Sequence, residues 1–317
     1  MTQYLVAIDG GGTKTDYLLS DLNGQVIKQL SHSPTSLTTN GIGIAAFNLR
    51  EGMRLLFEGI PTGKIAVLVI AVAGLDTREE NNQAHTIFSE VLNTFPFDQL
   101  KLINDSMAAL ANGSQAEQAI ILIGGTGANC LGYNQSQIIK VSGLDYVLTD
   151  EGSGYDAGRL ALRAAVRSFD GRGPKGLLEG LVFDHFQVKK ASQLKAKVYN
   201  PALTKAETAS LAQECHQAMK AGDSVATAII NYCLDELLLN VQTVAQQLAL
   251  TDQAFDLVIA GSFITNLSDL FHQRLSLKLP HARLIAPKQL PVFGALKIAQ
   301  QIHAGQDCRQ YDLPNFC

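Results

Sequence analysis

Two glycine-rich turns, each lying between apolar segments, constrain the fold of this chain more than any other feature of its sequence. The first follows the apolar run 5–8, reads Gly-Gly-Gly-Thr-Lys-Thr at 10–15, and leads into a second strand-like segment at 16–20. The second reads Gly-Gly-Thr-Gly at 124–127, again between strand-like segments. Short apolar runs bounded by turn residues predict buried strands. Two such hairpins about a hundred residues apart indicate a duplication in which each hairpin begins its own half of the protein.

The first turn fits neither of the common nucleotide-binding glycine motifs. A P-loop requires G-x-x-x-x-G-K-[ST], a dinucleotide fingerprint requires G-x-G-x-x-G, and both open a helix. Here the glycines lead into a strand, and Asn23-Gly24 then supplies the chemistry of a second turn. We therefore interpret the segment as a hairpin whose backbone N–H groups face an anion. A tight hairpin that binds no ligand is the alternative.

The composition is that of a globular chain with room for two domains. Of the 317 residues, 46% are hydrophobic and 17% are charged, and the net charge is −4. We expect neither nucleic acid nor a membrane as a partner, because basic runs do not exceed pairs and no apolar run reaches the length of about 18 residues that a membrane span requires. The five cysteines lack C-x-x-C spacing and no secretion signal is visible, so a cytoplasmic location is expected.

Four further segments follow in a characteristic order. Residues 100–113 read as a strand and then a helix, and residues 149–174 as an acidic glycine turn before a long helix that begins near Gly158. Residues 255–266 form an apolar strand that runs into Gly-Ser, and residues 291–299 enter a last helix. With the two hairpins, this order resembles the actin/hexokinase/Hsp70-like ATPase superfamily. Within it, the chain most resembles the branch of N-acetylglucosamine kinases and BadF/BadG/BcrA/BcrD ATPases, because "TDEGSGY" is similar to that branch's G-D-E-G-S-x-Y segment.

The resemblance implies a two-domain α/β architecture. Two RNase H-like domains are expected, each with a mixed five-stranded sheet and flanking helices, and with the active-site cleft between them. The expected domains are residues 1–111 with 300–317, and residues 112–299, which include a helical insertion over 189–248. The last helix, over 294–302, is expected to pack on the first domain. A homodimer is also expected, by resemblance alone.

Phosphoryl transfer from ATP is the chemistry that the resemblance implies for the hairpins. Such transfer needs the γ-phosphate held in line and its charge neutralised. Asp9 ends a buried strand, where a carboxylate is costly without a partner, so a hydrated Mg²⁺ is expected there; a strand-end capping role is the alternative. The residues expected at the phosphates are Gly10, Gly11, Gly12, Thr13, Lys14, Gly125, Thr126 and Gly127.

Asp105 is the expected general base. In the family pattern this aspartate accepts the proton of the sugar hydroxyl, although Asp and Asn are also favoured helix N-caps. Asp150 and Asn129 are expected at the sugar hydroxyls, because carboxylate and amide groups suit hydroxyl recognition. Glu151 either joins them or complements a helix dipole. The residues implied at the sugar are Ser36, Asn40, Gly74, Asp76, Asn104, Asp105, Asn129, Asp150 and Glu151, and those implied at the adenosine are Gly261, Ser262 and Asn266.

The sugar pocket departs from the family pattern in three places. Ser36 stands where the family commonly has Asn, the family's Gly-Trp-Gly reads Gly143-Leu144-Asp145, and Thr149 replaces a glycine before Asp150. The chain has no tryptophan to stack on a sugar face. If Asp145 faces the pocket, its carboxylate favours an acceptor with a free ammonium group, such as glucosamine; a solvent-exposed hairpin position is the alternative.

The sequence therefore predicts an ATP- and Mg²⁺-dependent kinase that phosphorylates the 6-hydroxyl of an amino sugar, N-acetylglucosamine or glucosamine. N-acetylmuramic acid is an alternative acceptor. A second alternative is an ATPase that drives electrons into a partner dehydratase or reductase, but the cysteines show no spacing for an iron–sulfur cluster. A sugar-responsive regulator would carry an added helix-turn-helix, and a first strand at about residue 4 leaves no room for one before it.

Overall fold

Two compact units make up the protein. The structure, a computed structural model, describes residues 2–75 and 77–312. Unit 1 comprises residues 1–121, 132–139 and 285–317, and unit 2 comprises residues 122–131 and 140–284. The domain boundaries expected from the sequence stay a prediction, because compactness alone does not test which parts fold independently.

Unit 1 is built on a five-stranded mixed sheet with the strand order β3-β2-β1-β4-β5. The strands β1 and β2 pair in antiparallel fashion across the first glycine turn, whereas β4 pairs in parallel with both β1 and β5. The elements of the first part of the chain are β1 (Thr2–Gly10), β2 (Thr15–Ser20), β3 (Val26–His32), α1 (Leu37–Asn40), α2 (Ile42–Phe57), β4 (Gly63–Val72), α3 (Arg78–Val91), β5 (Phe97–Asn104) and α4 (Asp105–Gly113), and those of the last part are α13 (Val292–His303) and the 3₁₀ turn η1 (Arg309–Tyr311).

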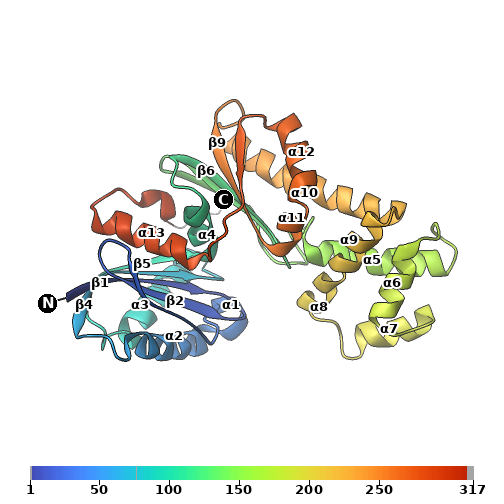
Figure 1. Cartoon of the computed structure of the whole chain (residues 1–317). Helices are drawn as coiled ribbons and strands as arrows, with labels where there is room; N and C mark the ends of the chain where they lie inside the picture. Colours follow the sequence, from blue (N-terminus) through green and yellow to red (C-terminus); the bar gives the residue numbers. More distant parts are fainter. Residues whose placement is uncertain (1, 76, 313–317) are drawn as a thin grey trace. The chain divides into compact units, whose positions relative to one another are not determined.

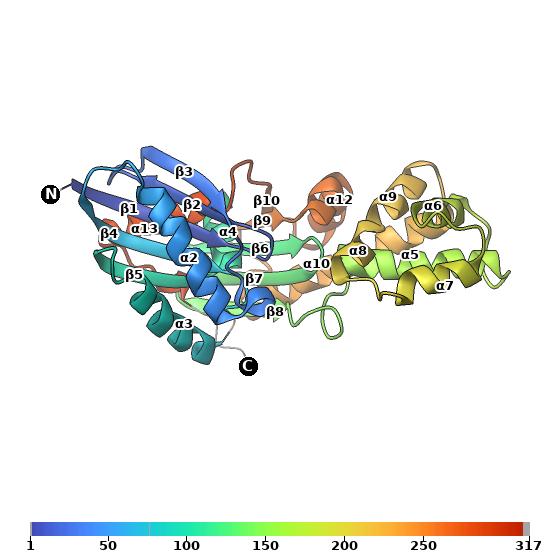
Figure 2. The same cartoon turned by 90° about the horizontal axis from the view of Figure 1, so that it is seen from below.

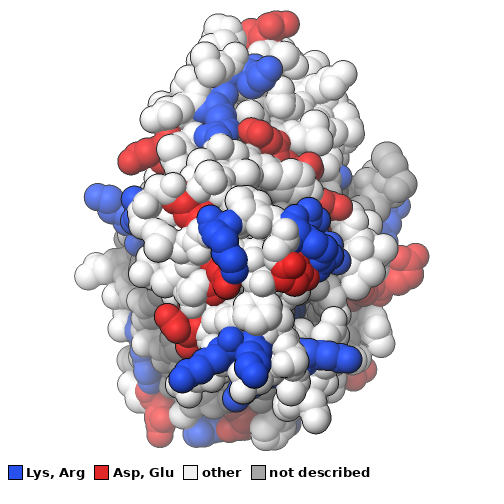
Figure 3. Space-filling model, turned by 90° about the vertical axis from the view of Figure 1, so that its right-hand side faces the viewer, with Lys and Arg blue, Asp and Glu red and all other residues white. Residues whose placement is uncertain are grey.

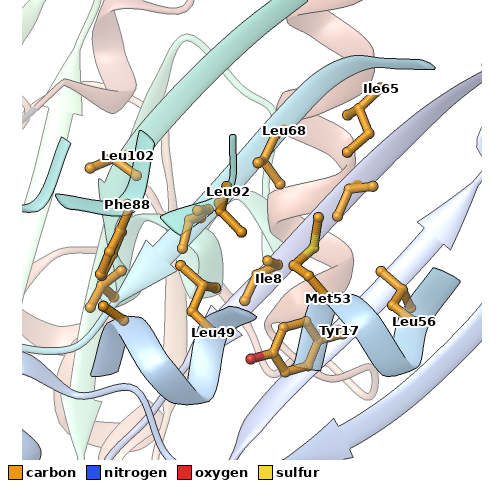
Figure 4. Close-up of a cluster of buried hydrophobic side chains, with 14 of the residues drawn as sticks. Ile8, Tyr17, Leu49, Met53, Leu56, Ile65, Leu68, Phe88, Leu92 and Leu102 are labelled. Atoms are coloured by element: carbon orange, nitrogen blue, oxygen red, sulfur yellow. The ribbon is translucent and has the colours of Figure 1, made fainter. Parts of the chain in front are cut away.

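Helices cover both faces of the first sheet. The helices α2 and α3 lie on one face, and α4 and α13 lie on the other (Figures 1 and 2). The alternating side chains of β1 and β4 meet α2 and α3 in an apolar core that includes Ile8, Tyr17 and Leu68 (Figure 4). The packing of α13 on this unit agrees with the expectation for the last helix, and Gly294 permits it, since a Cβ there would lie 1.8 Å from Ala108 O.

A second five-stranded sheet has the order β10-β9-β6-β7-β8. The hairpin between β6 and β7 holds the second glycine turn. The elements from this hairpin onward are β6 (Gln118–Gly124), β7 (Ala128–Asn134), β8 (Gln137–Ser142), α5 (Gly154–Phe169), α6 (Leu177–His185), α7 (Ala191–Tyr199), α8 (Lys205–Ser210), α9 (Ala212–Lys220), α10 (Ser224–Gln247), β9 (Phe255–Ala260), α11 (Ser262–Asn266), α12 (Ser268–Lys278) and β10 (Ala282–Ile285). Two five-stranded sheets with flanking helices confirm the predicted fold class.

The helices of unit 2 include the predicted insertion. Residues 189–248 form α7 to α10, as expected, whereas α5 begins at Gly154, four residues before the predicted start, because Ser153 caps it by accepting a hydrogen bond from Asp156 N. Figure 3 shows the side of the molecule on which these helices lie, and there Lys and Arg side chains are interspersed with Asp and Glu. Within the described residues, α10 alone has the length and apolar composition of a membrane span, with 44% of the relevant window buried. A buried core helix of a globular domain meets the same criterion, so α10 is weak evidence for a membrane.

The short helix α8 sits unusually close to α5. A Cβ on Gly158 would lie 1.9 Å from Thr208 O, so only glycine permits this approach. We expect Gly158→Ala to lower the free energy of unfolding by about 1–3 kcal/mol, because the backbone of α8 must shift. Urea unfolding of the variant measures this loss.

The control is Gly180→Ala on α6, where a Cβ would meet nothing within 4 Å. That variant is expected to gain up to about 1 kcal/mol from helix propensity. Equal effects of the two substitutions would contradict the steric argument.

Candidate active site

The first glycine turn is a tight hairpin tied to two neighbouring loops of unit 1. Gly11 N donates to Lys14 O at 3.0 Å, Ser36 N donates to Gly11 O at 3.2 Å, and Ala73 N donates to Gly10 O at 2.9 Å. A Cβ on Gly10 would lie 2.1 Å from Thr35 Oγ1, so the loop before α1 can approach only a glycine. The predicted phosphate hairpin and the loops that contain Ser36 and Gly74 therefore lie together in one unit.

Three carboxylates gather around the first hairpin. Asp9 and Asp16 are cross-strand partners on β1 and β2, and Asp105 is the first residue of α4. Burial, followed by the charges of Asp105 and Asp16, raises the pKa of Asp9 to about 7, and the nearby Lys14 ammonium opposes this shift. Lys14 Nζ lies 2.7 Å from Asp16 Oδ2. Lys14 thus pairs with a carboxylate, beside the expected phosphate position.

This acidic group suits a cation only in part. Asp9 and Asp105 each place a carboxylate where a positive charge relieves their mutual repulsion. However, among the described residues no three His, Cys, Asp or Glu side chains form a ready metal site. A Mg²⁺ ion would therefore fit beside Asp9 if phosphate oxygens and water supplied its other ligands, which is the usual coordination of Mg²⁺ at nucleotides.

Asn104 and Asp105, at the start of α4, have different contacts and different exposure to solvent. Asn104 is buried, its Oδ1 accepts from Ser106 N at 2.9 Å, and its Nδ2 donates to Leu75 O at 3.1 Å. It therefore caps the helix and holds the loop after β4. The Asp105 carboxylate also accepts from Ser106 N, at 2.9 Å, and is only partly buried. A helix start at the end of a parallel strand thus presents the predicted base.

The other residues of unit 1 that were predicted to bind the sugar differ in their hydrogen bonds and burial. Ser36 is 2% exposed, and its hydroxyl caps α1 by accepting from Thr39 N at 3.2 Å. The Oδ1 atom of Asn40 is buried, and no hydrogen bond to it is found within the described residues. Gly74 adopts a φ of 83°, in the loop that follows β4. Asp76 lies outside the described residues.

The second glycine turn lines a cavity of about 240 Å³ in unit 2. Gly125 and Thr126 form one wall, and their carbonyl groups accept hydrogen bonds from Gly154 N at 2.8 Å and Tyr155 N at 3.1 Å, at the start of α5. Gly261, with φ of 94°, lies so close that a Cβ there would be 2.6 Å from Gly124 O.

The opposite walls of this cavity come from two separate segments. Ser262 and Asn266, predicted at the adenosine, lie on α11 and line the cavity. Gln213 and His216 line it from α9. Burial and the charge of Lys220 lower the pKa of His216, so its imidazole is neutral near pH 7 and both donates and accepts hydrogen bonds. Side chains that both donate and accept hydrogen bonds therefore line this wall of the cavity.

Asp150 is the centre of a second polar group in unit 2. It is 4% exposed, and its Oδ1 accepts from Ala128 N at 3.0 Å. Lys205 Nζ of α8 lies 2.6 Å from Asp150 Oδ2 and 2.5 Å from Asp145 Oδ1. The hydrogen bond from Lys205 lowers the pKa of Asp145. Because this lysine already compensates Asp145, the hypothesis that Asp145 selects an ammonium sugar is weakened.

Two further predicted residues flank this group. The Asn129 side chain lies against Gly143, where a Cβ would be 3.0 Å from Asn129 Cγ. Glu151 is exposed and lines, with Asp150, a second cavity of about 330 Å³. Tyr146 and Tyr155 also line this cavity, with ring centroids 4.8 Å apart. These tyrosines provide an aromatic surface in a chain without tryptophan.

Four residues at these sites escaped the sequence analysis. Asp16 faces Asp9 across the hairpin, and the pairing of strands around a short turn could have located it. Lys205, Gln213 and His216 had no local signal, because they lie in the helical insertion and reach the site only through tertiary packing; Lys205 follows its partner Asp145 by 60 residues.

A two-sheet α/β fold with a glycine hairpin in each sheet defines the class of nucleotide-binding proteins that includes actin-like ATPases and sugar kinases. Within that class, the chain belongs to the BadF/BadG/BcrA/BcrD ATPase family, whose sequence profile matches residues 6–299. This result confirms the family resemblance found in the sequence.

Individual proteins of known sequence or structure resemble the chain along its length. It is 32% identical to an N-acetylmuramic acid/N-acetylglucosamine kinase of Clostridium acetobutylicum, over 94% of this chain and 98% of that protein. It is 25% identical to an N-acetyl-D-glucosamine kinase of Dictyostelium discoideum, with the same coverage. A crystal structure of a candidate N-acetylglucosamine kinase from Chromobacterium violaceum shares the fold, with a TM-score of 0.75, 21% identity, and coverage of 95% of this chain and 99% of that one.

Proposed function

We propose that this protein is an ATP-dependent sugar kinase that transfers the γ-phosphoryl group to the 6-hydroxyl of an amino sugar. N-acetylglucosamine and N-acetylmuramic acid are the leading acceptors, because a relative with 32% identity is named for both. Glucosamine is the less favoured acceptor, because the Asp145 carboxylate that would attract its ammonium group is paired with Lys205.

One observation carries the proposal. Gly125 and Thr126 of the second glycine hairpin line a cavity of about 240 Å³ together with Ser262 and Asn266, two of the residues expected at the adenosine, although the two segments are more than a hundred residues apart. Backbone N–H groups of a glycine turn suit phosphates, and the neutral His216 with Gln213 suits the base. This combination supports ATP as the phosphoryl donor.

Asp105 would act as the general base. In the proposed reaction its carboxylate accepts the proton of the sugar hydroxyl, the sugar oxygen bonds to the γ-phosphorus, and the bond to the β–γ bridging oxygen breaks to release ADP. Gly11 N–H and Gly125 N–H are hydrogen-bonded within their own turns, to Lys14 O and Gly127 O, so these glycines would shape the phosphate hairpins. The phosphate donors would be Gly12 and Thr13 in the first hairpin, and Thr126 and Gly127 in the second. Mg²⁺, when bound beside Asp9, supplies neutralisation of phosphate charge.

Asp150 would orient the sugar through its hydroxyl groups, with Asn129 alongside. The Asp150 carboxylate is held in place by a hydrogen bond from Ala128 N and by an ion pair with Lys205. We further propose a cytoplasmic location, on the odd number and spacing of the cysteines, and a homodimer, on the family resemblance alone.

Release of ADP in a coupled assay tests the proposal. Mg-ATP is supplied with N-acetylglucosamine, N-acetylmuramic acid, glucosamine, N-acetylmannosamine, glucose or no sugar. We expect one or both N-acetylated acceptors to raise the rate of ADP release at least tenfold above the no-sugar control. Kinases exclude water from their active sites and so hydrolyse ATP only slowly when no acceptor is bound.

Equal rates with and without every sugar would contradict a kinase and favour an ATPase with a protein partner. The described cysteines do not favour the iron–sulfur version of that alternative. Burial raises the pKa of the Cys215 thiol to about 12, and buried thiols of this kind are poor sources of the thiolate that a cluster needs.

A further inference from the structure

Lys205 joins two carboxylates that differ sharply in their surroundings. Its Nζ lies 2.6 Å from Asp150 Oδ2 and 2.5 Å from Asp145 Oδ1, so one ammonium group forms ion pairs with both carboxylates. The Asp150 side chain is 3% exposed, whereas that of Asp145 is 62% exposed. One partner is therefore buried and fixed, and the other is at the surface.

The two ion pairs of Lys205 differ in the free energy needed to separate them. Separating Lys205 from Asp150 would leave a buried carboxylate without its cation, which is strongly unfavourable. Separating Lys205 from Asp145 returns only the exposed Asp145 carboxylate to water, and an ion pair with such an exposed partner contributes little to stability. Lys205 can therefore exchange Asp145 for another anion while it keeps Asp150.

The surroundings of Lys205 favour a sugar as the source of that anion. Its Nζ lies 5.8 Å from the centroid of the Tyr146 ring, which lines the cavity of about 330 Å³ beside Asp150. A Cβ on Gly127 would lie 2.9 Å from the same Nζ, so the ammonium is packed directly against the second glycine hairpin. An aromatic surface, the Asp150 carboxylate and a cation thus lie side by side.

We propose that Lys205 recognises a carboxylate on the ring substituent of an acidic amino sugar, and that Asp145 competes with this carboxylate for the lysine. The proposal rests on the proposed kinase function, with Asp150 at the sugar hydroxyls. A neutral amino sugar leaves the Lys205–Asp145 pair closed. An acidic one replaces Asp145, so this residue sets the preference between the two classes of acceptor.

The test compares kcat/KM for N-acetylmuramic acid, which is acidic, with kcat/KM for N-acetylglucosamine, which is neutral. Asp145→Asn removes the competing anion and is expected to raise the acidic-to-neutral ratio about threefold. Lys205→Met removes the cation and is expected to lower that ratio roughly tenfold or more. Lys205→Arg should keep the ratio within about threefold of the wild type, because it keeps the charge.

Lys195→Met serves as the control, because Lys195 is exposed on α7 of the same insertion. It should leave the ratio unchanged. Raising the salt concentration should shrink the gain of Asp145→Asn, since exposed charges are screened.

Opposite shifts of the ratio in Asp145→Asn and Lys205→Met support the proposal. A ratio that stays within twofold of wild type in both folded variants overturns it while the kinase assignment stands. If Lys205→Met does not fold, Asp145→Asn decides alone. If the wild type releases no ADP with any sugar, the proposed function fails and this inference fails with it.

Discussion

The Asp105→Asn variant is expected to lose about 10²–10⁴-fold in kcat, the usual contribution of a positioned general base. The amide keeps the shape of the side chain and its hydrogen bond from Ser106 N, but it cannot accept the proton of the sugar hydroxyl. The affinity for ATP should remain within a few-fold of wild type, because the cavity predicted for the base and ribose is lined by other residues. Steady-state kinetics and calorimetric titration with ATP measure the two quantities.

Asp269→Asn is the matched control, since Asp269 is an exposed aspartate in the first turn of another helix, α12. Like Asp105→Asn, this variant removes a negative charge from the first turn of a helix, which lowers stability only modestly. Its kcat should stay close to that of the wild type. If Asp105→Asn lowers kcat by less than tenfold, Asp105 serves only the start of α4 and a different base must exist.

The Asp9→Asn variant is expected to inactivate the enzyme and yet to stabilise the nucleotide-free protein at pH 8. The pKa of Asp9 is raised to about 7 by burial and by its acidic neighbours, so the folded state binds its proton more tightly than the unfolded state does. Below about pH 4 the carboxyl is protonated in both states and carries no penalty. As pH rises from about 4 to 7, the unfolded state ionises first and stability is lost; above pH 7 the full penalty applies.

Removing this carboxylate should raise the free energy of unfolding at pH 8 by about 2–4 kcal/mol. The corresponding rise in Tm is roughly 3–6 °C for a chain of this size, and the rise should be clearly smaller at pH 5. Thermal unfolding at both pH values, without nucleotide or metal, measures it. Asp252→Asn, at an exposed turn residue, is the control and should change Tm little at either pH. Equal changes at pH 5 and pH 8 would rule out ionisation of Asp9 as the cause.

These two variants test complementary features of the acidic group in unit 1. Asp105 lies at the start of a helix where its carboxylate is partly exposed, which suits proton transfer from a bound hydroxyl. Asp9 is held against like charges, which suits a cation. Strain of this kind at a functional site is commonly tolerated because the rest of the fold is stable enough to hold it.

The sequence by itself determined the elements that local chemistry dictates. Glycines after an apolar run predicted both hairpins, because only a turn without side chains can bring two such strands together there. Asn104-Asp105 predicted the start of α4, since short polar side chains cap helices. The family resemblance that the order of these motifs carries implied two five-stranded sheets, which the structure confirms. The start of α5 was placed four residues late, because the capping role of Ser153 was not recognised.

Only the tertiary structure decided how distant segments meet. The pairing of Lys205 with Asp150 and Asp145, and the approach of Gln213 and His216 to the glycine hairpin, depend on the packing of α8 and α9 on α5. No local pattern encodes such contacts, because a lysine on an exposed helix has the same local sequence signal whether it meets water or a carboxylate. The ion pair of Asp145 likewise depends on the fold. The negative charge of Asp145 is visible in the sequence, but Lys205 reaches it only because Gly158 lets α8 pack closely on α5.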